Sequence, residues 1–192
     1  MEKNRLEAFS DGVLAIIITI MVLELKVPDS AHWEDLQRLL PRAIGYVLSF
    51  TFVGIYWVNH HHMLQIVKHV NSAILWANLN LLFWLSLIPF ATGWMGENHF
   101  ATNTVVVYAV LLLLCGIAFT ILQRMIMRNH HFDGALALAI SRLNRKGYIS
   151  TACYMAAIPA AFYDTRISCG LFAVVSMMWL IPERSIEKAL ND

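Results

Sequence analysis

The sequence predicts an all-α membrane protein with six transmembrane helices. Of its 192 residues, 58% are hydrophobic and only 14% are charged. Soluble domains average about 45–50% apolar residues, even with glycine counted, and about 25% charged residues. The chain also contains a series of long stretches without Asp, Glu, Lys or Arg. Since a helix needs about 20 mostly apolar residues to cross a bilayer, these stretches predict membrane spans rather than a soluble core.

Six spans are predicted, and the connectors between them are short, so residues 1–192 form one membrane domain. The first span has the shortest uncharged stretch, and it reaches spanning length only when Phe9 and Glu24 are included. Pro89 and Pro159 predict kinks in the third and fifth spans. The longest connector contains a brief amphipathic helix at residues 33–40. The predicted spans are residues 6–27, 41–66, 70–95, 102–127, 146–163 and 166–182.

The distribution of positive charge predicts the orientation of these spans. If both termini lie on one side, ten of the 14 Lys and Arg residues lie on that side and four lie on the other. Positively charged loops remain in the cytoplasm. We therefore expect a multi-pass protein with cytoplasmic N and C termini.

Charge and motif content argue against several classes of function. A net charge of +1 supplies no positive field for nucleic acid. The sequence contains neither HExxH nor GxSxG, so we predict no enzyme activity. Consecutive histidines, as in His60–His62 and 130–131, point about 100° apart on a helix, whereas chelation favours i and i+4. No metal or cofactor is therefore predicted.

One side of the first span carries a stripe of aliphatic residues. At about 100° per residue, Ile16, Ile20 and Leu23 share this stripe with Thr19. In one interpretation, the stripe contacts lipid or packs against a neighbouring helix. In the other, copies of the stripe from several subunits line a pore, where rings of Ile and Leu resist wetting and gate ions. A single helix does not decide between them.

Asp11 lies on roughly the opposite side of the first span and must face protein or water, because contact with lipid is costly. Arg5 is about 240° away on a regular helix, which makes the histidines at 60–62 the better candidate partners. A carboxylate beside a histidine cluster also suggests a rival function, a proton-coupled or ion-coupled secondary transporter that uses Asp11 and His60–His62 as a relay. Asn78, in the third span, is expected to bond across helices.

Three segments resemble a known family. Residues 5–11 have the form R-x-x-x-F-S-D, which resembles the opening of the first helix in the lysosomal/endosomal potassium channels known as transmembrane protein 175. Residues 56–61 (YWVNHH) and 78–92 resemble segments of that family's second and third helices. The segments occur in the family's order, and the resemblance extends over nearly the whole chain. The chain is similar to a bacterial member of the family.

This resemblance implies a homotetramer in the bacterial inner membrane, with a central pore lined by the first helix. It implies passive conduction of potassium, with the permeation of other monovalent cations left open. The carbonyl filter T-V-G-Y-G of standard potassium channels is missing from the sequence. By position, the constriction falls at Ile16, Ile20 and Leu23, with Thr19 as the polar pore residue. The structural motif of the first helix comprises Arg5, Phe9, Ser10 and Asp11, and its expected partners are Trp57, His60, His61 and Asn78.

Overall fold

The structure, a computed structural model, describes residues 2–28, 30–67, 69–128 and 135–180; for residues 135–139 it describes the backbone alone. This part of the chain is all helical, as predicted. Its elements are α1 (Lys3–Leu23), α2 (Trp33–Arg38), α3 (Leu40–Ile66), α4 (Ser72–Ser86), α5 (Ile88–Glu97), α6 (Thr102–Met127), α7 (Ala135–Tyr163) and α8 (Thr165–Leu180).

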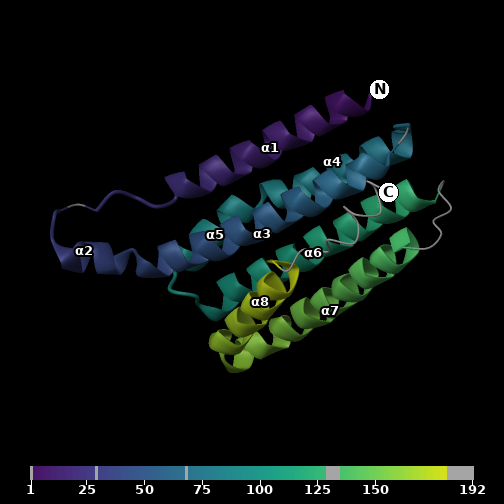
Figure 1. Cartoon of the computed structure of the whole chain (residues 1–192). Coiled ribbons are helices and arrows are strands. Elements are labelled where there is room, and N and C mark those ends of the chain that lie inside the picture. The colour runs from purple at the N-terminus through teal and green to yellow at the C-terminus, as the bar shows by residue number, and fades with distance from the viewer. Residues whose placement is uncertain (1, 29, 68, 129–134, 181–192) are drawn as a thin grey trace.

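The long helices run side by side and alternate in direction (Figure 1). Helix α1 forms one edge of the bundle and packs against α3, α4 and α5. Helices α7 and α8 form the opposite edge, and α6 lies between the two groups, against both α4 and α7. This arrangement places α1 where a large part of its surface faces away from its own chain.

The buried face of α1 follows the helical repeat. Leu6, Leu14, Ile17 and Met21 are buried, together with the polar Ser10. Their spacing of three or four residues places them on one side of the helix. Burial of apolar side chains away from water stabilises helix contacts outside the membrane, and close packing of side chains stabilises helix contacts within it. This face therefore holds α1 against the bundle.

The third predicted span is broken in two. Helix α4 ends at Ser86, Leu87 connects the segments, and α5 begins at Ile88 with Pro89 in its first turn. Proline lacks a backbone N–H and is best tolerated in the first turn of a helix, where that group has no partner within the helix. The predicted kink at Pro89 is therefore a helix boundary. In contrast, α7 continues through Pro159.

Other helix bounds also differ from the predicted spans. Helix α1 ends at Leu23 rather than at residue 27; Pro28 disfavours helical backbone at Val27, the last residue of the predicted span. Helix α7 begins at Ala135, eleven residues before the predicted span at 146. Arg142 and Arg145 separate the apolar residues 135–140 from that span; such charges end an uncharged stretch, but a helix tolerates them. Residues 181 and 182 of the sixth predicted span lie outside the described residues.

Three helical stretches among the described residues are both long and apolar enough to cross a membrane. They are Lys3–Leu23, Thr102–Met127 and Ser72–Glu97, the last formed by α4 and α5 together. Helix α8, with 16 residues, is apolar but shorter. Helix α3 is long, but its last part includes the polar segment 59–62, and the first half of α7 carries Arg and Lys residues.

Buried hydroxyl groups connect three of these helices. The Ser49 hydroxyl on α3 lies 2.6 Å from Thr92 Oγ1 on α5 and 2.8 Å from the Tyr108 hydroxyl on α6. All three side chains are buried. Mutual hydrogen bonding removes the cost of placing these polar groups inside the bundle, and it fixes α5 between α3 and α6.

Candidate functional site: the first helix and its contacts

The aliphatic stripe of α1 points away from the chain's own bundle. Ile16, Ile20 and Leu23 are 58%, 42% and 76% exposed, respectively. Thr19, which is also exposed, donates a hydrogen bond from Oγ1 to the Ile16 carbonyl at 2.9 Å. The structure therefore brings the four predicted pore residues to one free surface, with a single hydroxyl among aliphatic side chains.

One flank of this surface meets α5. An open groove of about 450 Å³ runs between the two helices and is lined by Ile16 and Ile20 on one side and Phe90 on the other. Glu24 closes one end and packs directly against Gly93. A methyl group at Gly93 would lie 2.7 Å from Glu24 Oε2, so glycine allows the carboxylate to lie against α5.

A buried hydrogen-bond chain fastens α1 to α3 and α4. Asn78 Nδ2 donates to Ser10 Oγ at 3.0 Å, and Ser10 Oγ donates to the Leu6 carbonyl at 2.8 Å. The Asn78 amide oxygen lies 2.6 Å from His60 Nε2. Because that oxygen only accepts, His60 Nε2 donates. We call Ser10, His60 and Asn78 the inner network; all three side chains are buried.

Asp11 is not paired with one of the candidate histidines but with Trp57, one of the partners expected from the resemblance. Its Oδ1 accepts a hydrogen bond from Trp57 Nε1 at 2.9 Å, on the exposed side of the α1–α3 contact. His60 belongs to the inner network instead. His61 stacks on the Trp57 ring at 6.4 Å and contacts Gln65. Helical geometry explains this division, since the consecutive residues 60 and 61 point about 100° apart.

The other two residues of the first-helix motif, Arg5 and Phe9, are exposed in the single chain. A further contact holds the beginning of α1, where Lys3 Nζ donates to the Gln65 carbonyl at the end of α3 and lies 3.7 Å from Glu7. The motif thus divides into Ser10 and Asp11, which contact the bundle, and two residues that face outward with the aliphatic stripe.

At the other end of α1, charged groups connect three segments. Glu97 Oε1 at the end of α5 lies 3.0 Å from Lys26 Nζ and 3.2 Å from Arg42 Nη2. We call these contacts the outer ion pairs. The hydrogen bond from Lys26 and the positive charges of both partners lower the pKa of the Glu97 carboxyl. The sequence places these charges at or near the ends of predicted spans, but it does not show that they pair.

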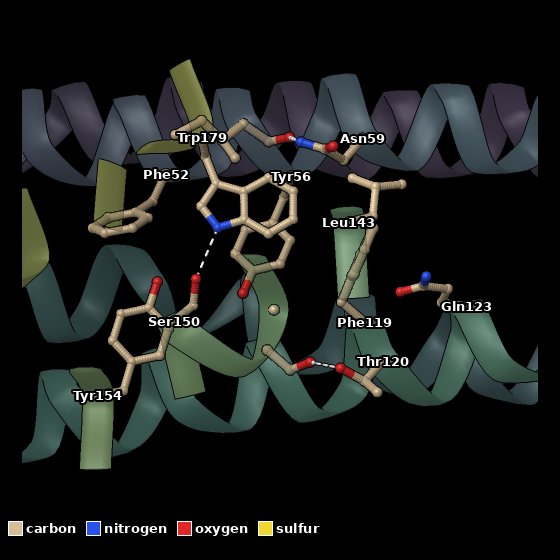
Figure 2. Close-up of a pocket in the computed structure, with 13 residues that line it drawn as sticks. Phe52, Tyr56, Asn59, Phe119, Thr120, Gln123, Leu143, Ser150, Tyr154 and Trp179 are labelled. Carbon is tan, nitrogen blue, oxygen red and sulfur yellow. Dashed lines mark hydrogen bonds between the residues drawn. The ribbon is translucent and has the colours of Figure 1, made fainter. Parts of the chain in front are cut away.

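A small cavity lies away from α1, between α3, α6, α7 and α8 (Figure 2). Its volume is about 50 Å³, enough for water, which needs at least about 10–15 Å³ by this measure. The Ser150 hydroxyl accepts a hydrogen bond from Trp179 Nε1 at its wall, at 2.8 Å. None of the predicted site residues lines it. The cavity is therefore separate from the surface of α1.

No group of three His, Cys, Asp or Glu side chains suited to a metal ion occurs within the described ranges. The prediction that the chain binds no metal was based on a different observation, the spacing of the histidines along the sequence. Residues 130–131 lie outside those ranges. Helix α1 thus presents an aliphatic side to the outside of the chain. Hydrogen bonds hold one end of this helix, and ion pairs hold the segment that follows its other end.

Comparisons with known proteins agree with this arrangement. Residues 5–89, which include α1 and its partners on α3 and α4, match the family described as endosomal/lysosomal potassium channel TMEM175. The chain is 53% identical, over the full length of both chains, to a potassium channel of Chryseobacterium sp. strain P1-3. It is 29% identical to a potassium channel of Streptomyces collinus, covering 93% of this chain and 91% of the relative.

A solved structure shows the same fold. The crystal structure of a lysosomal potassium-selective channel TMEM175 homologue from Chamaesiphon minutus superposes with a TM-score of 0.83, at 28% identity, over 96% of this chain and 98% of the other. The chain belongs to the TMEM175 family of endosomal/lysosomal potassium channels, which are integral membrane proteins and ion channels rather than enzymes.

Proposed function

We propose that four copies of this chain surround a central pore lined by α1 and conduct potassium passively across the bacterial inner membrane. The observation that carries this proposal is the division of α1 into two faces. One face is buried against the chain's own α3, α4 and α5, while the face with Ile16, Ile20 and Leu23 is exposed. When four chains associate symmetrically, the exposed face of each α1 meets the same face of the other three copies.

In this assembly, Ile16, Ile20 and Leu23 form successive aliphatic rings. A narrow ring of this kind resists wetting and blocks ions until it widens. Aliphatic side chains cannot replace the water around an ion, so discrimination between ions arises from the cost of dehydration and from polar atoms at Thr19. The Thr19 hydroxyl already donates to a backbone carbonyl, and its oxygen lone pairs remain available to a passing cation.

The membrane arrangement follows from the helices. Six passages are proposed, formed by α1, α3, α4 with α5, α6, α7 and α8, and α2 lies on the membrane surface. Their alternating directions in Figure 1 support this topology. The excess of Lys and Arg at one end of the bundle supports cytoplasmic N and C termini. The inner network then lies near the cytoplasmic side, and the outer ion pairs lie near the opposite surface.

Single-channel recording tests the pore assignment. We expect Ile16→Asn to increase resting conductance, by at least about tenfold, because an amide hydrates the constriction. The matched control is Ile44→Asn on α3, since Ile16 and Ile44 are both 58% exposed but only Ile16 lies on the proposed pore face. Unchanged currents in polar variants of Ile16, Ile20 and Leu23 would remove α1 from the pore.

The same preparation tests the rival transporter mechanism, in which Asp11 and His60–His62 relay protons. A channel shows unitary current steps and conducts potassium down its gradient without a coupled ion. A carrier shows no unitary steps, and its potassium flux stops when the proton gradient is removed. We expect unitary steps, because the structure assigns His60 to a hydrogen bond with Asn78 and Asp11 to one with Trp57.

A further inference from the structure

Helices α6 and α7 lie side by side, and neither is adjacent to α1 (Figure 1). A second groove runs between them. It is open and has a volume of about 490 Å³. Its character changes along α6, from Ile117 and Ile121 to Arg124 and Arg128, and Tyr148 of α7 contributes to the opposite wall. We call it the α6–α7 groove. An amphipathic groove of this kind matches an amphipathic ligand.

The sequence of α6 accounts for this change. Ile117, Ile121, Arg124 and Arg128 follow each other at intervals of four, three and four residues, which places them on one helical face. From the first to the last, the helix rises about 16 Å at 1.5 Å per residue. Half of a bilayer's hydrocarbon core is about 15 Å thick. The groove therefore extends over the depth of one leaflet.

The cationic end of the groove is available to a ligand. Arg124 and Arg128 are exposed, and among the described residues neither guanidinium takes part in an ion pair or a side-chain hydrogen bond. Guanidinium groups bind phosphate oxygens through paired hydrogen bonds. Tyr148, which is also exposed, has the amphipathic ring that is enriched at the level of lipid headgroups.

We propose that the α6–α7 groove binds an anionic phospholipid. The lipid phosphate contacts Arg124 and Arg128, and one acyl chain lies along Ile117 and Ile121. The two positive charges favour a headgroup with net negative charge over a zwitterionic one, whose own cation they repel. Basic sites between transmembrane helices recognise anionic headgroups in this way. The inference requires that the chain lies in a membrane, but it does not depend on the proposed pore.

Native mass spectrometry of the purified full-length protein tests the proposal with two lipids of identical chains, phosphatidylglycerol and phosphatidylcholine. The wild type is expected to retain phosphatidylglycerol roughly tenfold better, a preference within reach of two cationic contacts. Arg124→Gln/Arg128→Gln should lose this preference. The control Arg142→Gln/Arg145→Gln removes the same charge from nearby α7 and should keep it. Equal retention of both lipids by the wild type overturns the proposal, as does equal loss in both double variants.

A second pair of variants tests the acyl part of the site without changing charge. Ile121→Trp should fill the groove and reduce bound phosphatidylglycerol several-fold, whereas Ile149→Trp, on a similarly exposed position of α7 outside the groove, should not. Glycerol phosphate is added in a separate arm. Displacement of the lipid by an equal concentration of glycerol phosphate, or unchanged binding in Ile121→Trp, shows that the acyl chain contributes nothing and contradicts the proposal.

Discussion

At its inner end, α1 is joined to α3 and α4 by uncharged hydrogen bonds inside the bundle, whereas the segment after α1 is joined to α3 and α5 by ion pairs at the surface. Ser10, His60 and Asn78 are buried, while Glu97 and its partner Lys26 are largely exposed. Breaking a buried hydrogen bond leaves a polar group without water, but solvent and salt screen exposed charges. We therefore expect the end of α1 that carries the inner network to be held more firmly than the end next to the outer ion pairs.

The largest effect is expected from Asn78→Ala, which removes the centre of the inner network. The substitution leaves the His60 ring N–H buried without an acceptor and leaves space beside Ser10. We expect a loss of about 2–3 kcal/mol of stability, measured by thermal unfolding in detergent. Asn80→Ala on the same helix is the control, because Asn80 is only partly buried. Equal losses in the two variants would mean that the inner network contributes no special stability.

A close backbone contact at the outer end predicts the next largest effect. A methyl group at Gly96 would lie 2.8 Å from the Arg42 Cα, so Gly96→Ala must separate α5 from α3. Overpacking of this kind costs about 1–3 kcal/mol. A methyl group at Gly54 of α3 meets no atom within 4 Å, and Gly54→Ala should leave the thermal unfolding midpoint unchanged or higher. An unchanged unfolding midpoint in Gly96→Ala would show that α5 and α3 are not tightly packed at this position.

Asp11→Ala should have a smaller effect, because it removes one hydrogen bond on the exposed side of α1. We expect a loss of about 1 kcal/mol and a weaker oligomer, seen by size-exclusion chromatography at low protein concentration. The permeability ratio of potassium to sodium should stay unchanged, since Asp11 lies on a different side of α1 from Ile16 and Ile20. A stable oligomer with altered selectivity would instead assign Asp11 to the ion pathway.

The smallest effect is expected from Glu97→Gln, and it should depend on pH and salt. The pKa of Glu97 is lowered from its ordinary value of 4.5. The ion pairs therefore stabilise the folded state above that value, and this contribution is lost as the pH falls through the lowered pKa. The difference in unfolding temperature between wild type and variant should vanish at low pH or in 1 M salt. A difference that persists in both conditions would indicate a contribution other than charge.

The sequence predicted the all-helical fold, and several helix bounds match predicted spans closely, because long apolar stretches report helices directly. Helix α6 covers residues 102–127, and α3 covers 40–66. The start of α7 was missed, since Arg142, Arg145 and Lys146 interrupt the apolar sequence and the predicted span was begun only after Arg145. The break at Leu87 was anticipated only as a kink, because Pro89 in a sequence is compatible with either a bent helix or a new one.

For the candidate site, the helical repeat was sufficient to place Ile16, Ile20 and Leu23 on one face, and the structure leaves that face exposed. The repeat did not identify the partner of Asp11, although the resemblance placed Trp57 among the partners expected for the motif. Carboxylate and imidazole are chemically compatible, so the histidines were the reasonable choice. Which side chain of α3 reaches Asp11 depends on how α3 is rotated against α1, and that rotation places Trp57 rather than a histidine beside it.

The sequence by itself determined which segments are helical, how apolar they are and which side of each helix is aliphatic, because these properties depend on residue spacing along one chain. Only the tertiary structure decided which helices touch and which polar groups meet. Asn78 joins residues 10 and 60, and Glu97 joins residues 26 and 42. The physical reason is that a hydrogen bond or ion pair requires two atoms within about 3 Å, and that distance depends on the packing angle and rotation of each helix.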